Sequence, residues 1–394
     1  MSSSGDGDKP AQSGLVDMGD IGFYSSNSPD VLVTFTIADL ANYPGSFSEI
    51  VLNVTWAQLQ SAAGGPLETA FIDDAISAIN AYNAANGTNV GIKLRVWGGY
   101  AAPDWAKNID GPPITITGQH TVDQNFTPQT IGRFWTADYI AAWTSLQNQL
   151  AATYDNNPVI RGISQTAGAS ATDEPFVPLK GDAPLAPPPS TATVNQVAEL
   201  QAGGYTDAAQ QLTLRAAIAD YAQWSTTPLD YTMNLFHLYD AVFGKTVGDA
   251  NFTLAVLQQA QNSTRLVQAG NHALNNPLPT SDSFVYAQMA AYAALDPAMA
   301  PASYQTASPK NLGSFGNWPN AVAQGVASDA GDIELWDGPG STGFLGLPPS
   351  QVQALAATLA AGNPPVTTGA PDDGSALGRR MAGRVIRRYG REAK

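Results

Sequence analysis

The sequence contains no cysteine, and this absence excludes several kinds of chemistry at once. It rules out a disulfide framework, a thiolate metal site and a thiol nucleophile. Basic residues are also scarce, with 18 Lys+Arg against 33 Asp+Glu and a net charge of -15 over 394 residues. So acidic a chain repels nucleic acid and anionic membranes, and we therefore expect a neutral partner and no nucleic acid.

Other signatures are missing as well. No apolar run approaches the length of a membrane span, and residues 1–14 lack the basic and apolar regions of a signal peptide. The chain has neither a Gly-x-Gly-x-x-Gly or Walker-type loop nor a Gly-x-Ser-x-Gly motif. We therefore expect no membrane span and no nucleotide cofactor.

What the chain does contain is typical of a folded protein with a polar, weakly charged surface. Hydrophobic residues make up 44% of the sequence and charged residues 13%. Low lysine content with abundant Ala, Thr, Asn and Gln resembles exported bacterial polysaccharide enzymes. We therefore expect a secreted or periplasmic protein.

Short β-rich runs alternate with longer amphipathic stretches along most of the chain, which indicates parallel βα units. The expected strands are Ile21–Tyr24 or Val31–Ile37, then Ile50–Trp56, Gly91–Trp97, Ile160–Thr166, Tyr231–Phe236, Arg265–Gly270, Tyr304–Ala307 and Ile333–Trp336. The expected helices are Leu67–Asn83, Thr136–Tyr154, Ala208–Trp224, Asn251–Gln261, Ser283–Leu295, Trp318–Ser328 and Pro349–Ala361. Eight strands with about as many helices predict an α/β protein, a (β/α)8 TIM barrel.

The pattern predicts a single large domain. Residues 1–19 form a flexible Ser/Gly/Asp leader, 20–361 the barrel, and 362–394 a Pro/Gly/Thr linker with a basic tail. A long, proline-rich loop follows the fourth strand between Val177 and Tyr205. Loops of this size in a barrel are usually functional.

Three segments together resemble the large clan of (β/α)8 glycoside hydrolases that use a pair of glutamates at the strand ends. Val51–Gln60 reads VLNVTWAQLQ and is similar to the clan's second strand, and Lys93–Gly99 reads KLRVWGG and is similar to its third. Gly162–Ser164, running on to Thr172–Pro175 with the sequence TDEP, is similar to a fourth strand that ends in Asn-Glu-Pro.

The resemblance implies a catalytic acid. In the clan, the Glu of Asn-Glu-Pro protonates the leaving oxygen, and this role carries over to Glu174, while Asp173 stands where the clan has an Asn that contacts the sugar. Such an acid must hold its proton near neutral pH, which burial at a barrel mouth and a like charge beside it favour. Without the resemblance, Asp-Glu-Pro would also suit an exposed turn.

The second carboxylate departs from the clan's pattern. The clan's nucleophile lies at the end of strand seven, where this chain has Gln305, which cannot attack. Three explanations are open: Glu334 or Asp337 on the last strand has taken over, the strand count is off by one, or the protein binds glycans without hydrolysing them. Of the carboxylates we favour Glu334, because strand alternation points it the same way as Trp336.

Further side chains fall where a barrel would place a sugar site. Aromatic rings stack on the apolar faces of sugars, and arginine in a strand interior needs a carboxylate partner or clamps substrate. Histidines after strands five and six suit hydrogen bonds to sugar hydroxyls, although each also suits a purely structural role. The expected substrate-binding residues are Trp56, Arg95, Trp97, Asp104, Trp105, Asp173, His237, His272, Gln305, Trp336 and Asp337.

We predict a glycoside hydrolase acting on a poly- or oligosaccharide, with Glu174 and Glu334 as its catalytic carboxylates and with no metal or other cofactor. The alternative is a non-catalytic barrel that binds glycan, which the missing carboxylate on strand seven supports.

Overall fold

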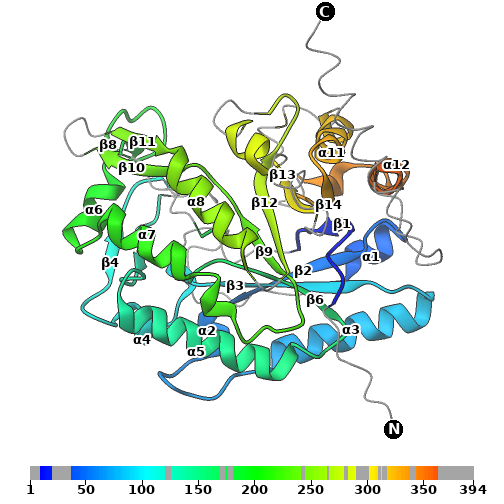
Figure 1. Cartoon of the computed structure of the whole chain (residues 1–394), viewed down its shortest axis with the longest axis horizontal. Helices are drawn as coiled ribbons and strands as arrows, with labels where there is room; N and C mark the ends of the chain where they lie inside the picture. Colours follow the sequence, from blue (N-terminus) through cyan, green and yellow to red (C-terminus); the bar gives the residue numbers. More distant parts are fainter. Residues whose placement is uncertain are drawn as a thin grey trace, which may run out of the picture.

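A computed structural model describes residues 9–19, 37–119, 126–168, 174–175, 181–240, 245–263, 266–278, 283–289, 301–308, 312, 317–336 and 343–362. At its centre eight parallel strands close into a barrel (Figure 1). In chain order they are β1 (Gly14–Asp17), β2 (Glu49–Thr55), β3 (Gly91–Trp97), β6 (Ile160–Ser164), β9 (Leu229–Thr232), β12 (Val267–Leu274), β13 (Ala302–Thr306) and β14 (Ala330–Leu335). The predicted (β/α)8 barrel, a single domain, is confirmed.

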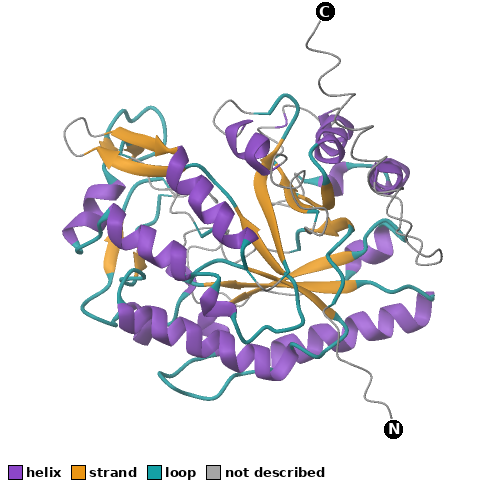
Figure 2. Ribbon diagram, in the orientation of Figure 1, coloured by secondary structure: helices purple, strands orange, loops and turns teal. Residues whose placement is uncertain are grey.

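Helices surround the barrel, as Figure 2 shows. The longer ones are α3 (Ala70–Asn86), α5 (Ala137–Tyr154), α7 (Asp207–Ala216), α8 (Ala250–Gln261), α11 (Trp318–Ala327) and α12 (Pro349–Gly362). Each buries an apolar stripe, as in α5, where Trp143, Leu146 and Leu150 face the core. Helix α3 ends at Gly87, whose φ of 64° is a left-handed conformation that glycine adopts without strain.

Shorter helices, turns and strand pairs lie outside the barrel sheet. They are α1 (Ala38–Asn42), α2 (Trp56–Leu59), α4 (Asp104–Lys107), α6 (Gln196–Ala202), the strand pairs β4 (Ile114–Ile116) with β5 (Gln129–Ile131), β7 (Ala183–Pro184) with β8 (Thr193–Val194) and β10 (Phe236–Asp240) with β11 (Lys245–Asp249), and the 3-10 turns η2 (Gly99–Ala101), η3 (Ala219–Tyr221) and η5 (Phe344–Gly346). None of the helices described is long and apolar enough to cross a membrane.

The first strand lies earlier than expected. Strand β1 pairs with β14 and β2, whereas Ile21–Tyr24 and residues 31–36 lie outside the described residues. The leader prediction for 1–19 is therefore wrong from residue 9 onward. The Lys9 ammonium donates to the backbone carbonyl oxygens of Asn157 and Ile160, at 2.8 and 2.6 Å, close to where β6 begins. A four-residue strand behind a Ser/Gly/Asp segment gives almost no periodic signal, which explains the error.

Two other boundaries differ. The fifth strand ends at Thr232, and the apolar run beyond it forms β10 of a separate antiparallel hairpin rather than continuing the barrel. The long loop after the fourth strand contains β7, β8 and α6, and the expected helix Ala208–Trp224 divides into α7 and η3. The linker and basic tail, from residue 363 onward, lie outside the described residues.

Candidate active site

Glu174 lies in the connection that follows the fourth barrel strand, which ends at Ser164, and its carboxyl group lies at the carboxyl ends of the fifth and sixth strands. Its side chain is 19% exposed, and the Asn234 amide nitrogen donates to its Oε2 at 2.6 Å. Asn234 follows the fifth strand, so two neighbouring strand ends meet at this carboxyl group. The carboxyl ends of the strands carry the active sites of barrel enzymes, and the carboxyl group of Glu174 lies at this end.

His272, on the sixth strand, is the second titratable group at this mouth. Its Nδ1 lies 3.9 Å from Glu174 Oε1, and its Nε2 is 2.8 Å from the Thr232 hydroxyl. Its side chain is 5% exposed. The register of β12 against β13 shifts between Asn271 and Leu274, and such irregularities near sites re-aim side chains.

Glu334 lies deeper, inside the barrel, and is fully buried. Its Oε1 accepts hydrogen bonds from Lys93 Nζ and Arg95 Nη2, both at 2.7 Å. Its Oε2 accepts from Arg95 Nη2 at 2.7 Å and from Gln305 Nε2 at 2.9 Å. Arg95 is thus a member of an ion pair, one of its two expected roles, and Gln305 is paired with Glu334.

The barrel interior around Glu334 is charged. Lys93 Nζ also contacts Asp230 Oδ2 at 2.8 Å and Asp332 Oδ2 at 3.4 Å, so a lysine on β3 reaches carboxylates on β9 and β14 across the barrel. Below them Gln12 donates to Glu49 Oε2 at 2.7 Å. Barrels of this type are usually filled by branched aliphatic side chains, so this core departs from the common pattern.

The buried carboxyl groups have very different proton affinities. Burial alone would raise the pKa of Glu334, but Arg95 and Lys93 hold it well below its ordinary range. Burial raises the pKa of Asp332 to about 7, although Lys93 opposes this shift, and burial likewise raises the pKa of Glu49. Burial disfavours the charged form of Lys93, yet Asp230, Glu334 and Asp332 together raise its pKa above the ordinary value. Glu334 is therefore ionised and Asp332 is largely protonated below neutral pH.

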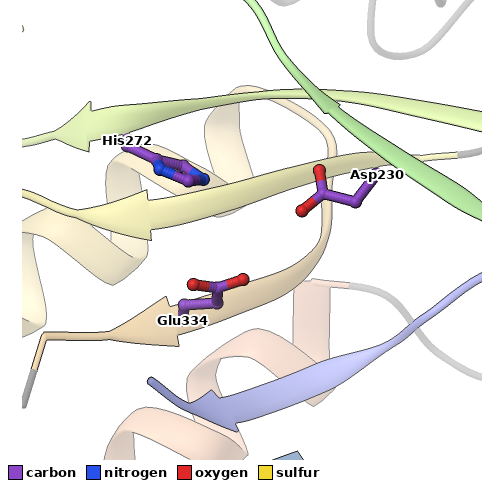
Figure 3. A group of neighbouring side chains, drawn as sticks. All are labelled: Asp230, His272 and Glu334. Carbon is purple, nitrogen blue, oxygen red and sulfur yellow. The ribbon is translucent and has the colours of Figure 1, made fainter. Parts of the chain in front are cut away.

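Asp230, His272 and Glu334 approach one another in an arrangement that resembles a metal site (Figure 3). One potential ligand atom from each lies within 4.8 Å of the others. However, the four hydrogen bonds that Glu334 accepts use the roughly four lone-pair positions of a carboxylate, and the Lys93 ammonium already lies between Asp230 and Glu334. These residues do not fit a metal, because a cation of the protein's own occupies the place.

The tryptophans divide between the core and the mouth. Trp56 was expected at the mouth but is fully buried, with edge contacts to Trp105, Tyr139 and Trp143. It begins α2 and therefore points into the layer between strands and helices. Trp105 is partly buried, and its indole nitrogen donates to the Gln60 carbonyl oxygen at 3.0 Å.

Trp97 and Trp336 belong to a small cluster with Met18 and Ala101, at the ends of β3 and β14. Trp97 is 1% exposed and donates to Asn53 Oδ1 at 3.0 Å, whereas Trp336 is only partly buried. Of these two rings, Trp336 is therefore the more accessible.

The remaining expected residues do not gather there. His237 is exposed on β10, in the hairpin outside the barrel, so the expected pairing of His237 with His272 at the strand ends does not form. Asp104 is exposed at the start of α4. Asp173 and Asp337 lie outside the described residues.

Sequence reasoning missed Lys93, Asn234 and Asn271. The sequence did carry a signal for Lys93, since Lys93 and Arg95, two positions apart in an otherwise apolar strand, both need buried partners. The sequence carried no such signal for Asn234 and Asn271, because the contacts of Asn271 with Asn234 and of Asn234 with Glu174 join segments that lie far apart in the chain.

No protein-family model and no curated protein matches this sequence. Solved structures do match its fold. Endo-glycoceramidase II from Rhodococcus sp., in complex with a five-membered iminocyclitol, is 13% identical with a TM-score of 0.51, and the match covers 89% of this chain and 79% of that one. The same enzyme in complex with a cellobiose-like imidazole is also 13% identical, with a TM-score of 0.50 and the same coverage of both chains. A β-galactosidase from Rahnella sp. R3 is 10% identical over 90% of this chain and 57% of that one, with a TM-score of 0.46. The fold of this chain is thus one that glycoside hydrolases use.

Proposed function

We propose that this protein is a glycoside hydrolase that cleaves O-glycosidic bonds of an oligo- or polysaccharide, with Glu174 as the proton donor. The observation that carries the proposal is the place of Glu174: a largely buried carboxyl group in the connection that follows the fourth strand of a (β/α)8 barrel, contacted from the ends of the fifth and sixth strands. A general acid in a barrel belongs at this face.

Glu334 is our proposed partner carboxylate. Glycoside cleavage uses one carboxyl group that holds a proton and one that is ionised, and Glu334 is kept ionised by Arg95 and Lys93. To attack a sugar, one of its oxygens must release a donor. The bond from Gln305 is the neutral one and therefore the weakest of the four, so Gln305 is the donor that we expect to move.

Two features favour a second candidate, a barrel that binds glycan without cleaving it. Glu334 is fully buried with all its acceptor positions in use, and the seventh strand offers an amide at Gln305. The substrates to test include neutral polysaccharides and glycoceramides, since one solved structure of a similar fold is that of an endo-glycoceramidase.

The experiment is a screen for new reducing ends, in parallel with a binding assay on the same glycans. We expect cleavage by the natural protein and, for Glu174→Gln, loss of nearly all turnover with unchanged glycan affinity and unchanged circular dichroism. Binding without any product would favour the glycan-binding barrel, and full activity of Glu174→Gln would overturn the assignment of the acid.

A further inference from the structure

A chain of three amide and carboxyl groups joins the sixth, fifth and fourth strand ends. Asn271 Nδ2 donates to Asn234 Oδ1 at 3.0 Å, and Asn234 Nδ2 donates to Glu174 Oε2 at 2.6 Å. Asn271 is fully buried and Asn234 is half-buried. Neither residue had a role in the sequence-based hypothesis.

The direction of this chain is fixed by the backbone at its start. Asn271 Nδ2 lies 2.9 Å from the Met233 carbonyl oxygen, which only accepts, and Asn271 Oδ1 accepts from the Ala273 N–H at 2.8 Å, which only donates. Both ends of the Asn271 amide are therefore assigned without ambiguity. The usual exchange of oxygen and nitrogen in an asparagine side chain is excluded here by chemistry.

The orientation of the Asn271 amide also fixes the orientation of the Asn234 amide. Since Asn271 presents an N–H, the atom of Asn234 that faces it must be the acceptor Oδ1. The amide nitrogen of Asn234 is then the atom directed at Glu174. A reversed Asn234 would place two donors together at one end and two oxygens together at the other, and both contacts would be lost.

We propose that Asn234 is a positioning residue for Glu174, and that Asn271 fixes Asn234 so that the acidic proton of Glu174 is carried on Oε1. The proposal rests on the proposed function in one respect only, namely that Glu174 is the proton donor. Oε2 accepts the amide N–H, so the neutral carboxyl group presents Oε2 as its carbonyl oxygen and Oε1 as its hydroxyl. Oε1 is also the oxygen that faces His272.

The arrangement orients the acid. A general acid must hold its O–H toward the leaving oxygen within hydrogen-bond reach, and a carboxyl group free to turn would present the wrong oxygen part of the time. A fixed donor on Oε2 removes that freedom. The same donor stabilises the ionised product of proton transfer, since N–H donors favour the carboxylate.

The test reads the titration of Glu174 directly and needs no substrate. The chain has only six glutamates, so protein labelled with ¹³C at the glutamate side-chain carboxyl gives few signals, and Glu174→Gln identifies the signal of Glu174. We expect Asn234→Asp to raise the titration midpoint of Glu174 by about one pH unit or more, because a donor is replaced by a like charge. The new aspartate carries no label and adds no signal.

Two variants and a control complete the design. Asn234→Leu and Asn271→Leu should each raise the midpoint by less than Asn234→Asp, and either one serves if Asn234→Asp does not fold. The matched control is Asn83→Ala, which removes another half-buried asparagine held by backbone groups, those of Val90, close to where β3 begins. It should lower stability and leave the titration of Glu174 unchanged.

The outcomes separate this proposal from the proposed function. Unchanged titration of Glu174 in Asn234→Asp, or in both leucine variants, would show that the asparagines serve folding alone. Shifted titration in a protein that cleaves no glycan would retain the positioning chain and reject the hydrolase. Where activity is found, the pH profile of kcat/KM should move in the same direction as the titration.

Discussion

The interior of the barrel and its mouth both contain carboxyl groups, but the two regions hold them in opposite ways. Inside, Glu334 is fully buried and bonded to two cations, and Asp230 and Asp332 share Lys93. At the mouth, Glu174 is partly exposed and is held by a neutral amide and a nearby imidazole. Two cations hold Glu334 ionised, whereas a carboxyl group that accepts from a neutral amide remains able to exchange a proton.

The difference suggests that the interior network mainly stabilises the barrel and that the mouth mainly carries the chemistry. The interior network ties β3, β9, β13 and β14 together across the barrel, so its loss should be felt as lost stability. The mouth residues lie at or beyond the carboxyl ends of the strands, where function in this fold resides. Apart from Glu334, which we propose as the partner carboxylate, substitutions in the interior should therefore change mainly stability, and substitutions at the mouth mainly chemistry.

The largest effect should follow from Lys93→Met. The methionine fills a similar volume but removes the cation that Asp230, Asp332 and Glu334 share, and only Glu334 keeps a second cation, Arg95. Breaking a buried ion pair from one side costs about 3 to 5 kcal/mol, and we expect a loss of this size in urea unfolding. Arg161→Met, at the half-buried start of β6, should cost less than about 1 kcal/mol. Equal losses would contradict a central role for Lys93.

A matched pair of substitutions sharpens the comparison. Glu334→Gln should lower the unfolding free energy by about 3 kcal/mol, because Arg95 and Lys93 lose their shared anion. Glu174→Gln removes a carboxylate of the same size from a partly exposed site and should cost less than about 1 kcal/mol. Urea unfolding of both variants at pH 7 measures the two losses of unfolding free energy. A larger loss for Glu174→Gln than for Glu334→Gln would show that Glu174 contributes more to stability than Glu334.

The pH dependence of stability should reveal the protonated member of the interior. Asp332, buried against Lys93, Asp230, Glu49 and Ser303, keeps its proton in the native state until about pH 7, whereas an unfolded aspartate loses it near pH ~3.9. Between these values the native state binds more protons, so its stability falls as pH rises, by at most about 1.4 kcal/mol per pH unit for this group.

Asp332→Asn should flatten that slope between about pH 4.5 and 7. The window lies above the ordinary glutamate range, where Glu334, with its lowered pKa, is ionised in both states and contributes no slope. The control Glu68→Gln alters an exposed carboxylate and should leave the slope as it is. Urea unfolding across this pH range measures the slope. An unaltered slope in Asp332→Asn would assign the proton to another buried carboxyl group, of which Glu49, whose pKa burial also raises, is the next to test.

The sequence carried enough information for the barrel and for part of the site. Strand β3 was predicted with its bounds because an apolar run interrupted by Lys93 and Arg95 ends at Trp97, directly before two glycines. Glu174 was singled out because TDEP after the fourth strand resembles Asn-Glu-Pro. Strand β1 could not be recognised from four residues. Trp56 was misplaced because its helical turn follows β2 immediately and rotates the ring into the core.

Contacts between distant strands were beyond any local pattern. The partners of Lys93 lie on strands far along the chain, and Asn271 reaches Asn234 through an irregularity in β12 that no sequence period reveals. His237 and His272 looked equivalent, each following an expected strand. They were separated only by the turn of the chain after Thr232, which sends His237 into the β10–β11 hairpin.

That pair of histidines gives the smallest expected effect and tests whether the mouth is as ordered as the contacts imply. His272→Asn removes the ring nitrogen 2.8 Å from the buried Thr232 hydroxyl and should cost about 1 kcal/mol in urea unfolding. His237→Asn, exposed on the hairpin, should stay within about 0.5 kcal/mol of the natural protein. If the two variants unfolded alike, the Thr232 contact would not persist in solution, and His272 could not lie reliably beside Oε1 of Glu174.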